Sequence, residues 1–157
     1  IFFSPTRYQE SYAAHVEAGL ARANQDGAQK SLSDLDIAPT VSVVIDDNLE
    51  VCYNALRPLL ALYIGGMGAR GRNFYNDLAV RYGYGDAAAE IQDHYLAGRK
   101  FDAMTAVPGE LIDEVALVGP KERIKERLSL WRDSPITTLN LTVPNVETLR
   151  TMAELVG

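Results

Sequence analysis

The stretch from residue 37 to residue 47, IAPTVSVVIDD, decides the fold. β-Branched residues are abundant in it, and no charged residue occurs before Asp46, which is typical of a buried strand, here Ile37–Ile45. Asp47 and Glu50 stand three residues apart, the spacing of a helix capping box, and the apolar residues after them predict a helix over 47–63. A buried strand therefore leads directly into a helix.

The same succession is predicted near both ends of the chain. Ile1–Phe3 has the character of the end of a buried strand, with Ser4 as the cap and Pro5 as the first residue of the helix that follows. Near the other end, residues 136–143 alternate polar and apolar side chains, which predicts a strand with one polar face, and 145–156 predicts a helix.

Strands that alternate with helices pair in parallel, so we expect an α/β domain. Two and a half strands cannot close a sheet, so the missing strands lie upstream or come from another chain. Because the chain starts inside a strand and without methionine, we expect it to be a fragment of a longer protein.

The region between the strands at 37–45 and 136–143 is predicted to be helical. Its last helix, 121–133, is strongly amphipathic, with Ile124, Leu128 and Trp131 expected to face inward. The shorter helices before it are predicted over 74–82, 86–97, 100–107 and 109–115.

Composition excludes several classes of function. The chain has 157 residues and a net charge of −6, without a basic stretch, which argues against nucleic-acid binding. No apolar run is long enough to span a membrane, so no membrane partner is expected. Cys52 is the single cysteine, so no internal disulfide can form, which suits a cytoplasmic protein. His15 and His94 have no partners at metal-ligand spacing, so no metal site is expected.

Residues 64–79, IGGMGARGRNFYNDLA, hold four glycines within seven positions. Phosphate-binding glycine loops follow a strand and open a helix, whereas this stretch follows a predicted helix. Its spacing, G-G-x-G-x-x-G, matches neither the Walker pattern nor a dinucleotide fingerprint. Two interpretations stay open: a helix end with a tight turn, or a mobile segment that brings arginines to a pocket.

The sequence resembles the C-terminal half of luciferase-like flavin and deazaflavin oxidoreductases, in particular the branch that uses coenzyme F420. The stretch ALYIGGMGARGRNFYNDLAVRYGY carries the resemblance most specifically, supported by PGELIDEVALVGPKERIKERL and TTLNLTV. The resemblance implies a (β/α)8 TIM barrel, of which this chain would hold the last three βα units. It also implies a helical insertion, at about 64–118, between the last two strands, within a partial barrel domain over 1–157.

The resemblance also implies where the site lies. TIM-barrel chemistry occurs at the carboxyl ends of strands, expected here at 3–7, 45–48 and 142–145. Ser4, Thr6 and Arg7 would stand at a helix N-terminus and hold a substrate or a cofactor phosphate. The alternative is an ordinary helix cap with a solvated arginine.

From the insertion, Arg70, Arg72 and Asn73 would close the pocket; the alternative is surface charge on a turn. No residue is assigned to catalysis, because the cofactor carries the hydride chemistry.

Two functions of different classes follow. The first is a fragment of an oxidoreductase that transfers a hydride between coenzyme F420 and a small organic substrate, with an FMN-dependent monooxygenase as the near alternative. The second is a non-catalytic helical α/β module that acts by association. In either case we expect a homodimer, or a complex with the missing N-terminal half, because a partial sheet leaves unpaired strand edges.

Overall fold

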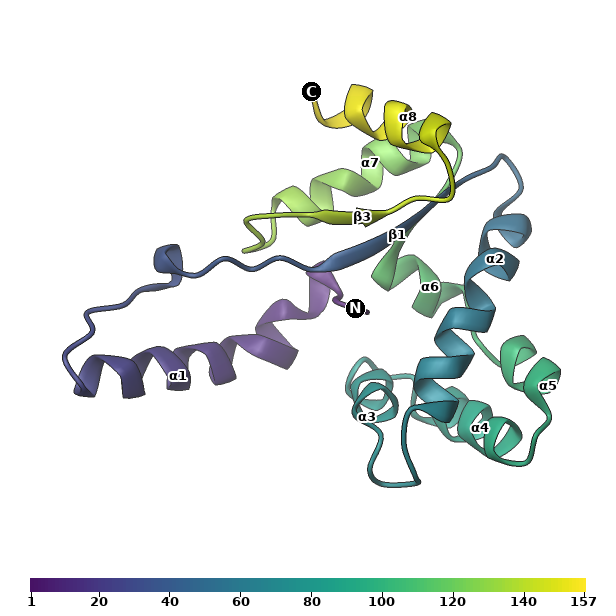
Figure 1. Ribbon diagram of the computed structural model, residues 1–157, viewed down its shortest axis with the longest axis horizontal. Helices are drawn as coiled ribbons and strands as arrows, with labels where there is room; N and C mark the ends of the chain where they lie inside the picture. The colour runs from purple at the N-terminus through teal and green to yellow at the C-terminus, as the bar shows by residue number, and fades with distance from the viewer.

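A computed structural model describes all residues from 1 to 157. It contains one parallel sheet of three strands in the order β2-β1-β3. The strands are β1 (Thr40–Ile45), β2 (Ala116–Gly119) and β3 (Asn140–Thr142). The α/β class and the parallel pairing are thus as predicted (Figure 1).

The strands differ from the predicted ones in number and length. Ile1–Phe3 is not a strand, because Phe2 adopts a left-handed backbone with φ of 60° that an extended strand cannot contain. Strand β2 was not predicted; it falls at the end of the range 64–118, so the helical segment lies between β1 and β2. The strand predicted over 136–143 shortens to β3, because only residues 140–142 pair with β1.

The polar N-terminal segment is helical, as predicted, but in three different forms. A 3₁₀ turn at Pro5–Arg7 is followed by a π-helical stretch at Gln9–Ala13 and by α1 (Ala14–Gln25). A further 3₁₀ turn, Leu32–Asp34, interrupts the loop before β1. In Figure 1 helix α1 projects away from the rest of the molecule.

The segment between β1 and β2 contains most of the helices. Helix α2 is capped by Asn48 rather than by the predicted Asp47, since the Asn48 side chain accepts from the N–H of Glu50 at 3.0 Å. The bounds of these elements are α2 Leu49–Ala61, a π-helical stretch Leu62–Gly66, α3 Phe74–Arg81, α4 Gly85–Leu96, α5 Lys100–Thr105 and α6 Gly109–Val115.

Two helices cover the face of the sheet that lies opposite α2. They are α7 (Lys121–Arg132) and α8 (Val146–Val156). Ile124, Leu128 and Trp131 are buried there, as predicted. In α8 the buried residues are Thr148 and Met152, whereas Leu149 is half exposed.

The sheet separates two apolar cores. Val41, Val43 and Leu117 pack against α7 and α8. On the other face, Ala116 and Val118 pack with α2 and the helices that follow it. None of the helices combines the length and the apolar character needed to cross a bilayer.

Candidate functional site

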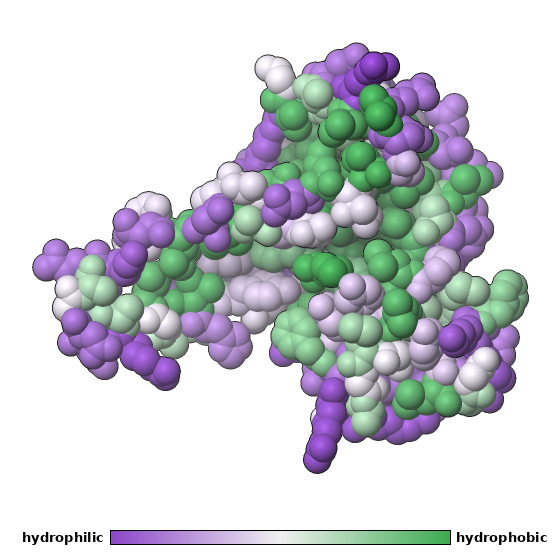
Figure 2. Space-filling model, in the orientation of Figure 1, coloured by the Kyte–Doolittle hydropathy of each residue, from purple (hydrophilic) through white to green (hydrophobic).

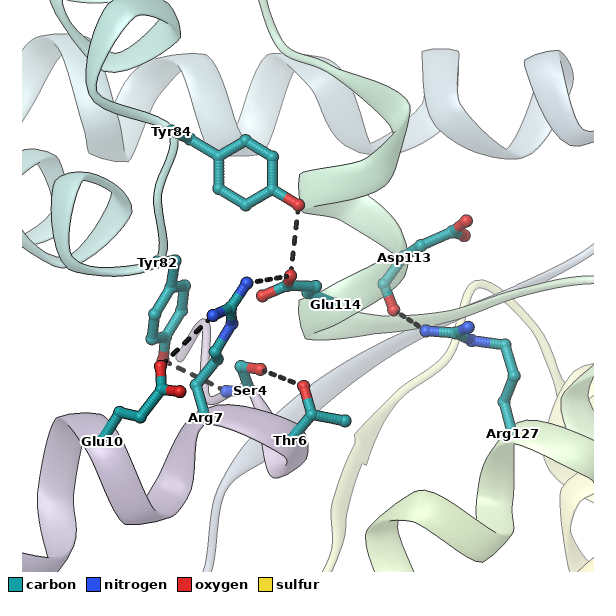
Figure 3. Close-up of polar contacts among 9 residues, drawn as sticks. All are labelled: Ser4, Thr6, Arg7, Glu10, Tyr82, Tyr84, Asp113, Glu114 and Arg127. Carbon is teal, nitrogen blue, oxygen red and sulfur yellow. Dashed lines mark hydrogen bonds and ion pairs between the residues drawn. The ribbon is translucent and has the colours of Figure 1, made fainter.

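The N-terminal polar cluster contains three of the six predicted binding residues, Ser4, Thr6 and Arg7, and Figure 3 shows it. Ser4 is completely buried, and its hydroxyl lies 3.2 Å from the hydroxyl of Thr6. The Ser4 side chain makes no bond to the backbone of the helix that follows, although Ser4 stands at its N-cap position. Its backbone N–H donates instead to the Tyr82 hydroxyl, at 3.1 Å.

Tyr82 joins the N-terminal segment to the helical segment between β1 and β2. Its hydroxyl donates to the carbonyl of Phe2 at 2.9 Å and lies 2.7 Å from the Tyr12 hydroxyl. Burial, reinforced by the hydrogen bond to Tyr12, raises the pKa of Tyr82 far above that of a free tyrosine. The hydroxyl therefore stays protonated and keeps its role as donor.

Arg7 lies between carboxylates. Its guanidinium contacts Glu10 at 3.2 Å and Glu114 at 3.5 Å, and both raise the Arg7 pKa, with the Glu10 hydrogen bond as the largest cause. The Tyr84 hydroxyl donates to the same oxygen of Glu114, at 3.2 Å. Burial first, and the Glu114 charge second, raise the pKa of Tyr84 to about 12. The charge of Arg7 is thus already compensated within the chain.

A hollow of about 270 Å³ opens beside this cluster. Three buried side-chain atoms of its lining residues have no hydrogen-bond partner: Asp113 Oδ1, Glu114 Oε2 and Arg127 Nε. Two of the three are carboxylate oxygens, which accept hydrogen bonds and repel anions. The residues present do not fit the phosphate of a nucleotide-like cofactor, so no binding step is assigned to such a group here.

The cluster lies toward the amino ends of the strands. The turn at Pro5–Arg7 packs on α6, which precedes β2, and on α7, with Arg127 and Leu130 beside it. Helix α7 begins at the carboxyl end of β2 and returns, so its second half lies near the amino ends (Figure 1). Of the three segments expected at the carboxyl ends of strands, 45–48 and 142–145 therefore lie there. Segment 3–7 does not.

The predicted residues of the glycine-rich stretch lie elsewhere and do different work. Asn73 is 1% exposed; its side chain accepts from the N–H groups of Tyr75 and Asn76 and so caps α3. The same side chain donates to the carbonyls of Tyr63 and Ile64, both at 2.9 Å. Asn73 is thus fully used inside the fold.

The two arginines of this stretch are exposed. Arg70 pairs with Asp93 of α4, whereas the side chain of Arg72 has no hydrogen bond or ion pair. A Cβ atom at Gly66 would overlap the ring of Tyr95, and Gly71 has φ of +68°, which favours glycine. The glycines therefore serve close helix packing and a turn, and the stretch does not meet Ser4, Thr6 and Arg7.

A second hollow, of about 180 Å³, lies at the carboxyl end of β1 against the first turns of α8. Its lining residues are Ile45, Asn145, Glu147, Thr148 and Thr151. Only Ile45 and Asn145 fall within the ranges expected from the sequence. Thr148 and Thr151 could have been found from the sequence. They stand three residues apart after the helix cap Asn145, a spacing that places them on one face of the first helical turns.

Comparison with known proteins adds three findings. The family model described as luciferase-like monooxygenase matches residues 1–138. A Mycobacterium tuberculosis protein named as a putative coenzyme F420-dependent oxidoreductase is 35% identical over 156 residues, which are 99% of this chain and 44% of that protein. This chain therefore spans less than half of the curated relative.

The third finding is a solved structure, the coenzyme F420-dependent tetrahydromethanopterin reductase from Methanopyrus kandleri. It superposes on 84% of this chain and 36% of its own, with a TM-score of 0.60 and 17% identity. At that identity the likeness concerns the fold alone. Since the family model covers most of the residues, the chain belongs to the luciferase-like monooxygenase family.

Proposed function

We propose that this chain is the C-terminal part of a luciferase-like oxidoreductase that transfers a hydride between coenzyme F420 and a small organic substrate. The observation that carries the proposal is the 35% identity, over nearly the whole chain, to a protein named for F420-dependent oxidation and reduction. F420 is the hydride carrier when bound, and the chain's part is to bind and orient. A cytoplasmic location suits the free thiol of Cys52.

The sheet supports a place in a TIM barrel. All three strands are parallel, α7 and α8 cover one face, and the carboxyl ends of β1, β2 and β3 point to the same side. In barrels that side holds the chemistry. We therefore assign any substrate contact of this chain to the turns at 45–48 and 142–145, and not to the N-terminal polar cluster.

The family model itself favours a second candidate, an FMN-dependent monooxygenase, because its description names a monooxygenase. Titration of the intact polypeptide with F420 and with FMN, followed by fluorescence quenching, separates the two. We expect F420 to bind with a Kd in the micromolar range or below, about −8 kcal/mol, and FMN more weakly. Preference for FMN would replace the first proposal by the second.

The isolated 157-residue chain provides the comparison for this titration. We expect it to bind F420 poorly, because its arginine-bearing cluster faces carboxylates and its sheet has three strands. Tight binding by the isolated chain would show that the site is complete within these residues.

The part of the sheet face that α2 leaves uncovered supports an assembly proposal. Thr40, Ser42 and Thr142 share this face and border an apolar hollow of about 170 Å³ that Ile1 and Leu59 also line. Apolar side chains gather in the middle of Figure 2, between the α7–α8 layer and the helical segment. We propose that barrel strands from outside residues 1–157 cover this face, in the same polypeptide or a second one.

Light scattering of the 157-residue chain at micromolar concentration tests the assembly. An uncovered edge and face bind other chains, so we expect a dimer or larger species. Addition of a separately expressed N-terminal half should convert it to a one-to-one complex. A monomer with one cooperative thermal transition would show that the three strands suffice.

A further inference from the structure

The hollow at the carboxyl end of β1 is lined by a buried threonine, Thr148, whose hydroxyl is unpaired. Thr148 is only 6% exposed, and its hydroxyl makes no hydrogen bond in the structure, whereas Thr105, on α5, donates to the carbonyl of Phe101 at 3.1 Å. A hydroxyl that has no partner within the protein and reaches a hollow is free to hydrogen-bond a ligand there. The Thr148 hydroxyl oxygen is not among the fully enclosed unpaired atoms, and Thr148 lines the hollow.

The backbone around the hollow is already arranged. Asn145 caps α8 by accepting from the Thr148 N–H at 2.8 Å, which fixes the first turn of an eleven-residue helix. Thr151, one turn further, lines the same hollow, and Ile45 at the end of β1 supplies the apolar wall. The site is thus built from the carboxyl end of a strand and the start of a helix, which is where barrels bind ligands.

The charge of the lining selects the kind of ligand. A helix N-terminus attracts anions, and barrels commonly bind phosphate near this position. Here Glu147 lines the hollow, with a full negative charge against about half a positive charge from the helix, and no lysine or arginine lines it. The hollow therefore disfavours phosphate and offers a carboxylate and two hydroxyls to hydrogen-bond donors.

We propose that this hollow is a subsite for the hydroxyl- or amine-bearing end of a small organic molecule. Glu147 accepts from the donor group, while the hydroxyls of Thr148 and Thr151 complete its hydrogen bonds. At about 180 Å³ it is smaller than the roughly 300–1,000 Å³ of complete ligand pockets, so it holds one end of a ligand. The identification of that ligand as the substrate rests on the proposed function; the binding itself does not.

The experiment is an NMR titration of the intact polypeptide with three probes: erythritol, ethanolamine and inorganic phosphate. We expect erythritol or ethanolamine to shift the amide signals of Glu147, Thr148 and Thr151, and phosphate to leave them unchanged. A response to erythritol alone would identify a neutral hydroxyl ligand, and a response to ethanolamine alone an amine. Binding of phosphate at these amides, or no response to any probe, would overturn the proposal.

Variants sharpen this test. Thr148→Val keeps the shape of the side chain and removes the hydroxyl, and we expect about three- to ten-fold weaker binding of the active probe. Thr148→Ser should restore most of the affinity. Thr105→Val is the matched control outside the hollow and should have no effect. Equal affinities for the wild type and Thr148→Val would overturn the role of the hydroxyl.

Glu147→Gln tests the selection by charge. The change should weaken ethanolamine and allow phosphate to shift the same amides, because the helix N-terminus is then no longer countered. A variant that still excludes phosphate and binds ethanolamine as before would show that Glu147 does not select the ligand. The affinity for F420 is measured separately, because it reports on the proposed function. We expect the three probes to leave that affinity unchanged.

Discussion

The N-terminal segment and the glycine-rich stretch both present arginines paired with carboxylates, yet the arginine is partly buried in the first and exposed in the second. At the N-terminus, Arg7 is partly buried and held by Glu10 and Glu114. In the glycine-rich stretch, Arg70 is exposed, and the buried polar residue is Asn73. The difference shows that the partner of a polar group, more than its type, determines whether the group is available to a ligand.

The largest effect expected from this comparison is the loss of Asn73. Asn73→Ala removes the cap of α3 and two donated hydrogen bonds, one to the buried carbonyl of Ile64 and one to the partly buried carbonyl of Tyr63, so we expect a loss of about 3 kcal/mol in the free energy of unfolding. Urea denaturation of the intact polypeptide measures it. Arg72→Ala, one position away, is the control and should change stability by less than about 0.5 kcal/mol. A small effect of Asn73→Ala would mean that Asn73 does not stabilise the fold and that the stretch is an ordinary surface turn.

Tyr82→Phe should follow in size. It leaves the buried N–H of Ser4 and the carbonyl of Phe2 without the Tyr82 hydroxyl, at an expected cost of about 2 kcal/mol. Tyr75→Phe is the matched control, because the Tyr75 ring packs against Phe2 while its hydroxyl has no hydrogen bond in the structure. Thermal unfolding of both variants checks the difference, and equal transitions would mean that the N-terminal segment is not tied by Tyr82.

Much of this contrast could not be predicted from the sequence. The sequence predicts binding roles for both Arg7 and Asn73, but Glu114, which compensates the charge of Arg7, lies 107 residues away from it. Their meeting depends on how α6 packs against the N-terminal turn, which no local pattern encodes. Asn73 looked like part of a loop, although its place immediately before the helix at 74–82 is the position of a cap.

The fold was predictable where local patterns are long. The strand at β1 and the amphipathic helix α7 follow from composition and period, and both are present. Strand β2 was missed because four apolar residues directly after a helix show no alternation. It becomes a strand only because it pairs with β1, in a register that runs from Ser42 opposite Ala116 to Ile45 opposite Gly119.

A smaller effect concerns alkaline pH. The pKa of Tyr84 rises from 10 to about 12 on folding, so the folded state favours the protonated phenol. The stability that this contributes is complete below pH 10 and is lost as the pH rises toward 12, by about 1 kcal/mol after allowance for solvent. Unfolding measured between pH 8 and 11 should show it. Glu114→Gln should reduce the decline, and an unchanged decline would mean that Glu114 does not act on Tyr84.

The smallest expected effect is that of the arginines on stability. Arg7→Ala and Arg70→Ala each remove ion pairs that are at least partly exposed, so the loss should stay below about 1 kcal/mol. Their predicted role in binding is a separate measurement: contact with an anionic group would make F420 bind about 1.5–3 kcal/mol more weakly in the variant. Unchanged dissociation constants in both variants would remove these residues from the site.

The order of the strands has a consequence for how the chain folds during synthesis. Strand β1 is the centre of the sheet, but its partners appear late: Ala116 follows Ser42 by 74 residues (116 − 42), and Asn140 follows Thr40 by 100 (140 − 40). At about 5–20 residues per second, a ribosome needs on the order of 5–20 s to supply the last of them. During that time the helices of the segment between β1 and β2 can form and shield one face of β1, while its two edges wait unpaired.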